Sequence, residues 1–484
     1  MEEKKQLKNK VTKNFIWRFL ERCGAQGVTF VVSIILARIL DPEAYGTIAL
    51  ITVFTSILQV FVDSGLGNAL IQKKDADNID FSTVFYANVI FSVALYFVVF
   101  LSAPLIAAFY KNWELVPLIR VLSLTLVISG IKNIQQAYVS KKLLFKKFFY
   151  STLGGTIFSA AVGIYMAYRG CGVWALVMQN VINQLVDTLI LWCVVNWRPQ
   201  LVFSMRRLKK LFSFGWKMLV SHLITVIYQD LRSLLIGKKY SSTDLAYYNR
   251  AVQFPNIVIS NVNSSIDSIL LPVMANEQEK KDRVKSMMQR SIKTSSFIIW
   301  PAMMGMAACA ETLIEIVLTE KWLPCVFYMR IFCITHAFYP IDTANLSAIK
   351  ALGRSDLYLK FGMLKKGFGI LILIISSFFG LKAIAISALF SSVISQLINA
   401  WPNKKLLKYP YIEQIKDILP YIILSSGMAL VVYVIGFFDF SDILTLVVQV
   451  LVGGALYIGG AWLLKLESLQ YCANLVKSLL KKDK

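Results

Sequence analysis

Polar and charged side chains recur at helical spacing inside segments that are otherwise apolar. One such segment carries Arg18 and Arg22, and a later one carries Lys217 and Arg232. Amides and hydroxyls continue the same two stripes, at Asn14, Gln26, Thr29, Ser33, Ser221, Thr225 and Tyr228. Residues three or four apart share one face of a helix. Because a charge in the middle of a membrane helix costs about 2.5 to 3.5 kcal/mol, these faces should meet a wet cavity or a partner.

Two of these cations occupy equivalent places in the sequence. Phe-x-Trp followed by a basic residue occurs at Phe15, Trp17 and Arg18 and again at Phe214, Trp216 and Lys217. Two cations that face one cavity repel each other unless an anion lies between them, and phosphate or pyrophosphate suits both side chains. Arg18 and Lys217 therefore predict a site for the phosphate end of a substrate. The alternative is that both side chains snorkel toward the headgroups, since each lies only about two turns into its helix.

Two carboxylates, Asp63 and Asp267, end polar stripes on the segments that follow. They could bind a coupling ion, H⁺ or Na⁺, or they could simply neutralise the nearby cations, and we favour the second interpretation. The two histidines, His222 and His336, are too few and too scattered for a metal site, and the cysteines form no CxxC pair. We expect no metal, no cofactor and no catalytic residue.

The composition indicates that these residues belong to a membrane protein. Hydrophobic residues make up 57% of the 484, the mean hydropathy is +0.61, and only 16% are charged, well below the usual quarter of a soluble domain. The net charge of +23 could suggest a nucleic-acid partner. The basic residues, however, lie in short clusters between long apolar runs, which is typical of loops that face anionic membrane lipids.

The apolar runs are long enough to cross a bilayer. They are centred near residues 25, 56, 95, 126, 158, 183, 223, 258, 301, 337, 369, 392, 427 and 453, and they predict an all-α membrane protein of about fourteen transmembrane helices. Odd-numbered loops hold far fewer basic residues than even-numbered loops and the two termini. The positive-inside rule therefore places both termini in the cytoplasm.

An internal repeat divides the predicted helices. Besides the Phe-x-Trp echo, IRVLSLT from Ile119 matches MRIFCIT from Met329, and VINQL from Val181 matches VISQL from Val393. Matches that keep their order indicate duplication of a helical unit. We expect an N-terminal six-helix lobe over 1–200, a pseudo-symmetric six-helix lobe over 201–403, and two further helices with a cytoplasmic tail over 404–484.

Four short motifs resemble a known transporter family. They are LARILDPEAYG from Leu36, DSGLGNALIQ from Asp63, YYNRA from Tyr247 and LPVM from Leu271. These motifs are similar to those of the polysaccharide transporter family in the multidrug/oligosaccharidyl-lipid/polysaccharide (MOP) flippase superfamily. The likeness covers nearly the whole chain and is greatest for the Wzx-like branch of colanic-acid and teichuronic-acid exporters.

The resemblance implies a function and a cargo. It implies a flippase that moves an undecaprenyl-pyrophosphate-linked oligosaccharide from the inner to the outer leaflet of a bacterial plasma membrane by alternating access. Membrane lipids, and H⁺ or Na⁺ as coupling ion, would be its other partners. The cavity cations of the family would correspond here to Arg18, Lys217, Arg250 and Lys365 or Lys366, with Arg22 on the same stripe as Arg18.

Other functions fit the residues less well. A multidrug or cation antiporter of the related MATE branch would share the fold, but its cavity should hold acids, whereas the intramembrane surplus here is basic. A polysaccharide polymerase or ligase would need a substantial outer loop, and the predicted outer loops are short. A structural or channel protein would not require a duplicated bundle with broken polar helices.

The loop charges generate a first prediction about topology. A Lys285→Cys variant in a cysteine-free background should react with a membrane-impermeant maleimide only after the cells are permeabilised, because the 280–293 loop is expected to be cytoplasmic. Labelling in intact cells would show that the orientation is the reverse.

Overall fold

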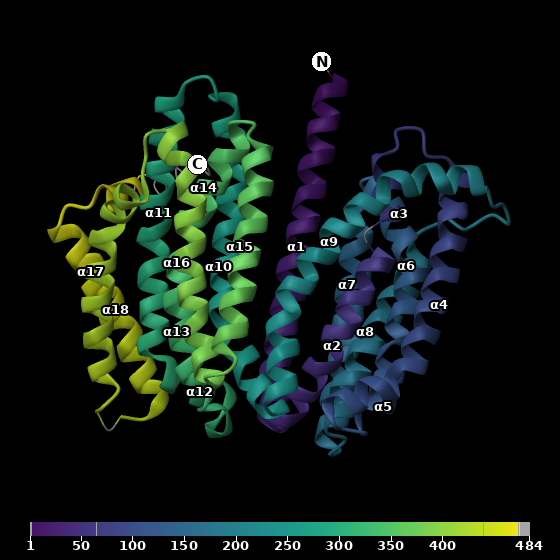
Figure 1. Ribbon diagram of the computed structural model, residues 1–484, viewed down its shortest axis with the longest axis horizontal. Helices are drawn as coiled ribbons and strands as arrows, with labels where there is room; N and C mark the ends of the chain where they lie inside the picture. The colour runs from purple at the N-terminus through teal and green to yellow at the C-terminus, as the bar shows by residue number, and fades with distance from the viewer. Residues whose placement is uncertain (1, 64, 439, 473, 475–484) are drawn as a thin grey trace. The chain divides into compact units, whose positions relative to one another are not determined.

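The computed structural model describes residues 2–63, 65–438, 440–472 and 474. These residues form helices and connecting turns, with no strand among them (Figure 1). In chain order the helices are α1 (Glu2–Ile39), α2 (Pro42–Asp63), α3 (Leu66–Gln72), α4 (Asn78–Tyr110), α5 (Leu115–Leu122), α6 (Leu124–Lys141), α7 (Phe145–Tyr168), α8 (Val173–Val194), α9 (Met205–Lys239), α10 (Ser242–Asn276), α11 (Lys281–Ala308), α12 (Ala310–Leu318), the 3₁₀ turn η1 (Glu320–Trp322), α13 (Cys325–Ala337), α14 (Tyr339–Ala351), α15 (Ser355–Ser376), α16 (Leu381–Leu406), α17 (Tyr411–Ile435) and α18 (Asp442–Leu463).

The predicted all-α membrane fold is confirmed. Every predicted span centre falls in a helix or in a pair of consecutive helices, such as α5 with α6 and α13 with α14. Within the described ranges, 9 helices are long and apolar enough to cross a membrane, and the number becomes 10 if α11 and α12, which meet at a 72° bend, form one broken span. Within the described part of the chain, α1 contributes a shorter apolar stretch, Cys23–Ile39.

The chain divides into two compact units, unit 1 over Met1–Ala246 and unit 2 over Tyr247–Lys484. This boundary falls later than residue 200, where we expect the sequence repeat to end, because α9 packs against α2, α3 and α4 of unit 1. A hydrogen bond from Ser56 of α2 to Asp230 of α9 ties the two helices together. The lobes over 1–200 and 201–403, which come from the sequence repeat, stay a prediction.

The repeat has a counterpart in the contacts inside each unit. Arg120 of unit 1 donates through Nε to the carbonyl of Phe100, 3.4 Å away. Arg330, its partner in the sequence match, donates through Nε to the carbonyl of Ala307 at 3.3 Å. In both units the arginine joins a preceding long helix, α4 or α11, to a later helix, α5 or α13. These contacts give the two cations a structural role, since each binds a backbone carbonyl of another helix.

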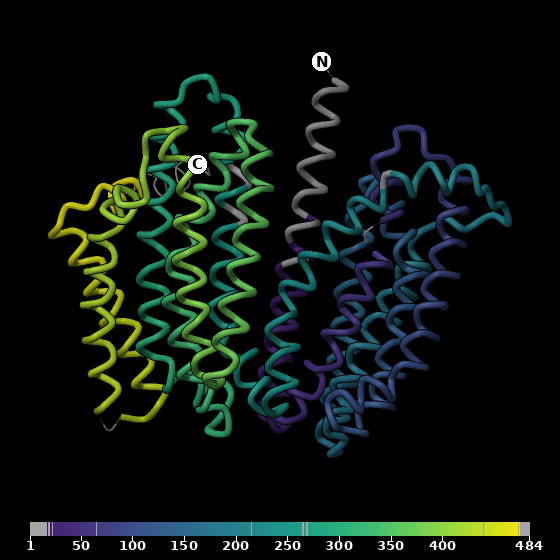
Figure 2. The backbone as a smooth tube through the Cα atoms, viewed as in Figure 1, coloured from purple at the N-terminus to yellow at the C-terminus, as the bar shows by residue number. Residues whose placement is uncertain are grey.

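A buried amide network fixes the C-terminal helices to unit 2. Asn345 of α14 donates to the side chain of Gln414 at 2.7 Å, and Asn403 of α16 donates to the side chain of Asn345 at 2.7 Å. All three side chains are completely buried. The network joins α14, α16 and α17, and α18 packs on α17 (Figure 2).

The network generates a prediction about stability. Asn345→Ala should destabilise unit 2 by about 1 to 3 kcal/mol for each partner amide left without a hydrogen bond, and the melting temperature in detergent should fall by roughly 2 to 4 °C per kcal/mol. Asn261→Ala is the matched control, because Asn261 is exposed and donates to a carbonyl of its own helix. Equal melting temperatures for the two variants would contradict a stabilising network.

Candidate functional site

The predicted substrate-binding cations are divided between the two units, and each unit is described by itself. Arg18, Arg22 and Lys217 belong to unit 1, whereas Arg250, Lys365 and Lys366 belong to unit 2. Arg18 and Arg22 lie on α1, but their side chains fall outside the described part of the chain. Their role stays a prediction.

Lys217 lies on α9 with its side chain exposed. It forms no ion pair with any carboxylate that the structure describes. The backbone beside it is held very close to the start of α3, because a Cβ on Gly215 would lie 2.6 Å from the carbonyl oxygen of Gly65. Only glycine allows this approach. Lys217 is therefore an exposed cation on a helix whose position is fixed by backbone packing.

Arg250, in contrast, packs inside unit 2. Its side chain is buried, donates from Nη1 to Gln253 at 2.7 Å, and stacks over the Trp322 ring at 5.4 Å. The YYNRA motif that contains it begins with Tyr247, which donates to the carbonyl of Lys321 at 3.2 Å. The motif therefore joins the start of α10 to η1. These contacts give Arg250 a structural role, and substrate binding by it stays a prediction.

Lys365 and Lys366 are half-buried on α15. Lys365 lies within electrostatic range of Asp342 on α14. Asp342 also accepts a hydrogen bond from Asn399 of α16 at 2.6 Å. Lys365 therefore has a local acidic neighbour, which reduces the attraction that it can offer to an anionic substrate.

The two predicted ion-coupling carboxylates contact neutral groups. Asp63 accepts hydrogen bonds from Gln59 at 2.8 Å and from Asn133 of α6 at 3.4 Å. Asp267 accepts one from Ser347 of α14. Since α6 and α14 correspond in the repeat, each acid contacts the corresponding helix of its own unit, although Asn133 and Ser347 are not equivalent positions. Neither forms an ion pair with a described cation. Because the side chains of Arg18 and Arg22 lie outside the described part of the chain, both interpretations, charge neutralisation and ion coupling, stay predictions.

Sequence reasoning missed a buried ion pair in unit 1. Lys132 of α6 lies 3.1 Å from Asp187 of α8 and also donates to Gln184. Both charged side chains are nearly inaccessible, with 10% and 9% exposed. The sequence repeat contained a signal for this pair. In its register Asp342 is the equivalent of Lys132 and Asn399 is the equivalent of Asp187, and Asn399 donates a hydrogen bond to Asp342.

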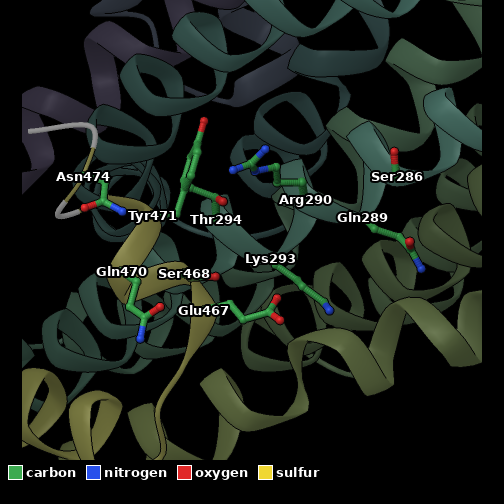
Figure 3. Close-up of a pocket in the computed structure, with 10 residues that line it drawn as sticks. All are labelled: Ser286, Gln289, Arg290, Lys293, Thr294, Glu467, Ser468, Gln470, Tyr471 and Asn474. Atoms are coloured by element: carbon green, nitrogen blue, oxygen red, sulfur yellow. The ribbon is translucent and has the colours of Figure 1, made fainter. Parts of the chain in front are cut away.

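A polar pocket of about 470 Å³ lies in unit 2 between α11 and the segment that follows α18 (Figure 3). Its two cations already have partners. The Arg290 guanidinium lies 4.0 Å from the centre of the Tyr471 ring, and Lys293 lies 3.2 Å from Asp417. The contact between Arg290 and Tyr471 therefore joins α11 to the C-terminal segment, and we assign no substrate to the pocket.

The chain is similar to known proteins in both sequence and fold. Residues 35–327 match the family described as polysaccharide biosynthesis protein. The teichuronic acid biosynthesis protein TuaB of Bacillus subtilis is 26% identical over 78% of this chain and 79% of its own length. Among solved structures, the lipid II flippase MurJ in an inward closed conformation aligns with a TM-score of 0.75 and 15% identity, covering 94% of this chain and 98% of its own. An inward-facing multidrug resistance MATE family transporter of the MOP superfamily aligns with a TM-score of 0.59 and 14% identity, covering 78% and 94%. At these identities the two structures establish the fold alone.

The buried ion pair generates a prediction. Lys132→Met or Asp187→Leu alone should destabilise the protein by about 3 to 5 kcal/mol, because each leaves an uncompensated charge, whereas the double variant should recover most of that loss. Thermal unfolding in detergent measures it. Glu311→Gln is the control, because its pair with Arg330 is exposed and worth about 1 kcal/mol or less. A double variant no more stable than the singles would contradict this account.

Proposed function

Because the chain belongs to the polysaccharide biosynthesis protein family, we propose that it is a flippase for an undecaprenyl-pyrophosphate-linked oligosaccharide. It carries this precursor from the inner to the outer leaflet of a bacterial plasma membrane by alternating access. Both termini lie in the cytoplasm, as the loop charges indicate.

One observation carries the choice of an anionic cargo. Lys217 is an exposed cation on a predicted membrane-spanning helix, and it has no acidic partner among the described residues. Lys132 and Arg330, by comparison, each have a carboxylate within 3.4 Å. A cation without a partner is retained in a membrane segment at a substantial cost, so it favours a ligand that supplies the missing negative charge. The pyrophosphate of a lipid-linked sugar is such a ligand.

The proposed role of each residue depends on whether its charge already has a partner in the protein. Lys217, together with Arg18 and Arg22 on α1, binds the pyrophosphate. Arg250, Lys365 and Lys366 contribute less to cargo binding, because Arg250 is packed on Trp322 and Lys365 is near Asp342. Asp63 and Asp267, whose bonds to neutral groups leave lone pairs available, take up the coupling H⁺ or Na⁺.

The alternative is a multidrug or cation antiporter. The fold likeness to a MATE transporter favours it, but a cation substrate would be repelled by Lys217. The two functions differ in a simple measurement, since an antiporter should lower drug accumulation in cells and a flippase should not.

The proposal predicts the effects of charge at two positions. Lys217→Arg should keep appreciable export of polysaccharide. Lys217→Ala and Arg18→Ala should each lose most export at normal protein levels, because the charge that holds the phosphate is gone. Mass spectrometry of the lipid fraction should then detect the lipid-linked precursor accumulating on the cytoplasmic side.

A neutral double substitution separates phosphate binding from snorkelling. If Arg18→Gln with Lys217→Gln exports polysaccharide at the wild-type rate, the two residues do not bind the cargo. The exposed Lys142→Gln variant is the matched control for loss of a positive charge in unit 1.

A further inference from the structure

An apolar pocket of about 930 Å³ lies within unit 1, between the first half of α9 and the helices α2, α3 and α4. This volume is within the range of roughly 300 to 1,000 Å³ that is typical of ligand-binding pockets. Its walls are mostly aromatic and aliphatic, with Phe61, Leu66, Phe91, Phe212, Trp216 and Val220 among them. The pocket is separate from the proposed phosphate site, since Lys217 does not line it.

The polar atoms of the wall leave little for water to bind. Asn88, on α4, already donates its amide to the carbonyl of Gly130 at 3.2 Å. Ser213 donates to the carbonyl of Lys210 on its own helix at 3.0 Å. Water enters a cavity where it finds two to four polar partners, and hydrocarbon fills an apolar one. A membrane offers hydrocarbon chains in excess, so the occupant has an apolar chain.

The first ten residues of α9 place positive charge at this pocket. Over 205–214 the helix is amphipathic, with Leu208 and Leu211 turned to the protein and Arg206, Lys209 and Lys210 exposed. Figure 1 shows this part of α9 crossing the end of unit 1 before the helix turns along the bundle. The Lys209 side chain lines the pocket. None of the three exposed cations forms an ion pair with a carboxylate in the described ranges.

Polar contacts hold this basic segment in place. Arg207 binds Asp77 at 2.5 Å and Asp80 at 3.3 Å, and the backbone N–H of Ser204 donates to Thr83 at 3.1 Å. The hydrogen bond from Arg207 lowers the pKa of Asp77 to about 2. A carboxyl whose folded pKa is depressed stabilises the structure above its unfolded pKa and loses that contribution only as the pH falls through about 2. The ion pair between Arg207 and Asp77 is therefore present at neutral pH.

We propose that this pocket is a binding site for an anionic phospholipid, with an acyl chain between α4 and α9 and the headgroup phosphate at Lys209. Charge complementarity selects this occupant. Basic clusters on an amphipathic helix attract anionic lipid by about 1 kcal/mol for each Lys or Arg near the surface, and a zwitterionic lipid lacks the net charge. The bound lipid acts as a wedge that supports α9 along α4. The site does not depend on the proposed cargo, because any membrane with anionic lipid supplies the ligand.

Trp216 provides a local probe of the pocket. The full-length protein is reconstituted in phosphatidylcholine vesicles that contain a small fraction of phosphatidylglycerol with brominated acyl chains, which quench tryptophan on contact. Subtracting the signal of a Trp216→Phe variant isolates Trp216 from the other nine tryptophans of the ten in the chain. We expect brominated phosphatidylglycerol in phosphatidylcholine vesicles to quench Trp216 several-fold more than the same fraction of brominated phosphatidylcholine does in phosphatidylglycerol vesicles.

Two variants and one control test the assignment. Lys209→Gln should lower the preference for phosphatidylglycerol about fivefold, the change that one basic residue gives. Ala87→Trp, which fills the pocket from α4, should reduce quenching by either lipid. The exposed Lys142→Gln should change neither. The melting temperature of each variant in detergent confirms that it is folded, and Lys209→Gln serves alone if Ala87→Trp does not fold.

Three outcomes would overturn the proposal. Equal quenching by the two lipids would show that no headgroup is selected. A preference that survives Lys209→Gln would place the phosphate elsewhere. Displacement of brominated phosphatidylglycerol by an equimolar amount of undecaprenyl phosphate would assign the pocket to the carrier lipid. The first two results do not bear on polysaccharide export, which the precursor measurement tests separately.

Discussion

The absence of water from the bilayer core constrains every polar group in this protein. A carbonyl, amide or charge inside the membrane must find its partner within the protein or face a wet space. Arg120 and Arg330 bind carbonyls of long helices, Lys132 is paired with Asp187, and Asn345 belongs to a buried amide network. These contacts add to the van der Waals packing between the helices, since lipid removes the hydrophobic drive for one helix to pack on another.

The same constraint separates structural charges from functional ones. Intramembrane cations look alike in the sequence, yet Lys132 is buried with an acid and Arg250 is buried against Trp322. Lys217 is exposed and forms no ion pair with a carboxylate in the described structure. A position that keeps such a charge without a partner is the one at which an anionic ligand has most to contribute, and this distinction is the basis of the proposed phosphate site.

Helix α9 combines three functions along one continuous element. Its start is a basic amphipathic segment attached to α4 through Arg207, its middle is packed by backbone contact at Gly215, and its end is joined to α2 through Asp230. Lys217 follows directly after the close glycine contact. The apolar pocket at its start and the exposed cation in its middle are thus held on a single rigid support within unit 1.

The sequence by itself determined the helical membrane fold and the approximate span centres, because apolar runs must match the bilayer thickness. Its repeated residue patterns predict a duplication. It also identified the cations and acids that require an explanation. Only the tertiary structure decided which of them are already satisfied. The partner of Lys132 is Asp187, 55 residues away, and that of Ser56 is Asp230, 174 residues away. Residue spacing along one helix indicates which side chains share a face, but which helix that face meets depends on how the helices pack.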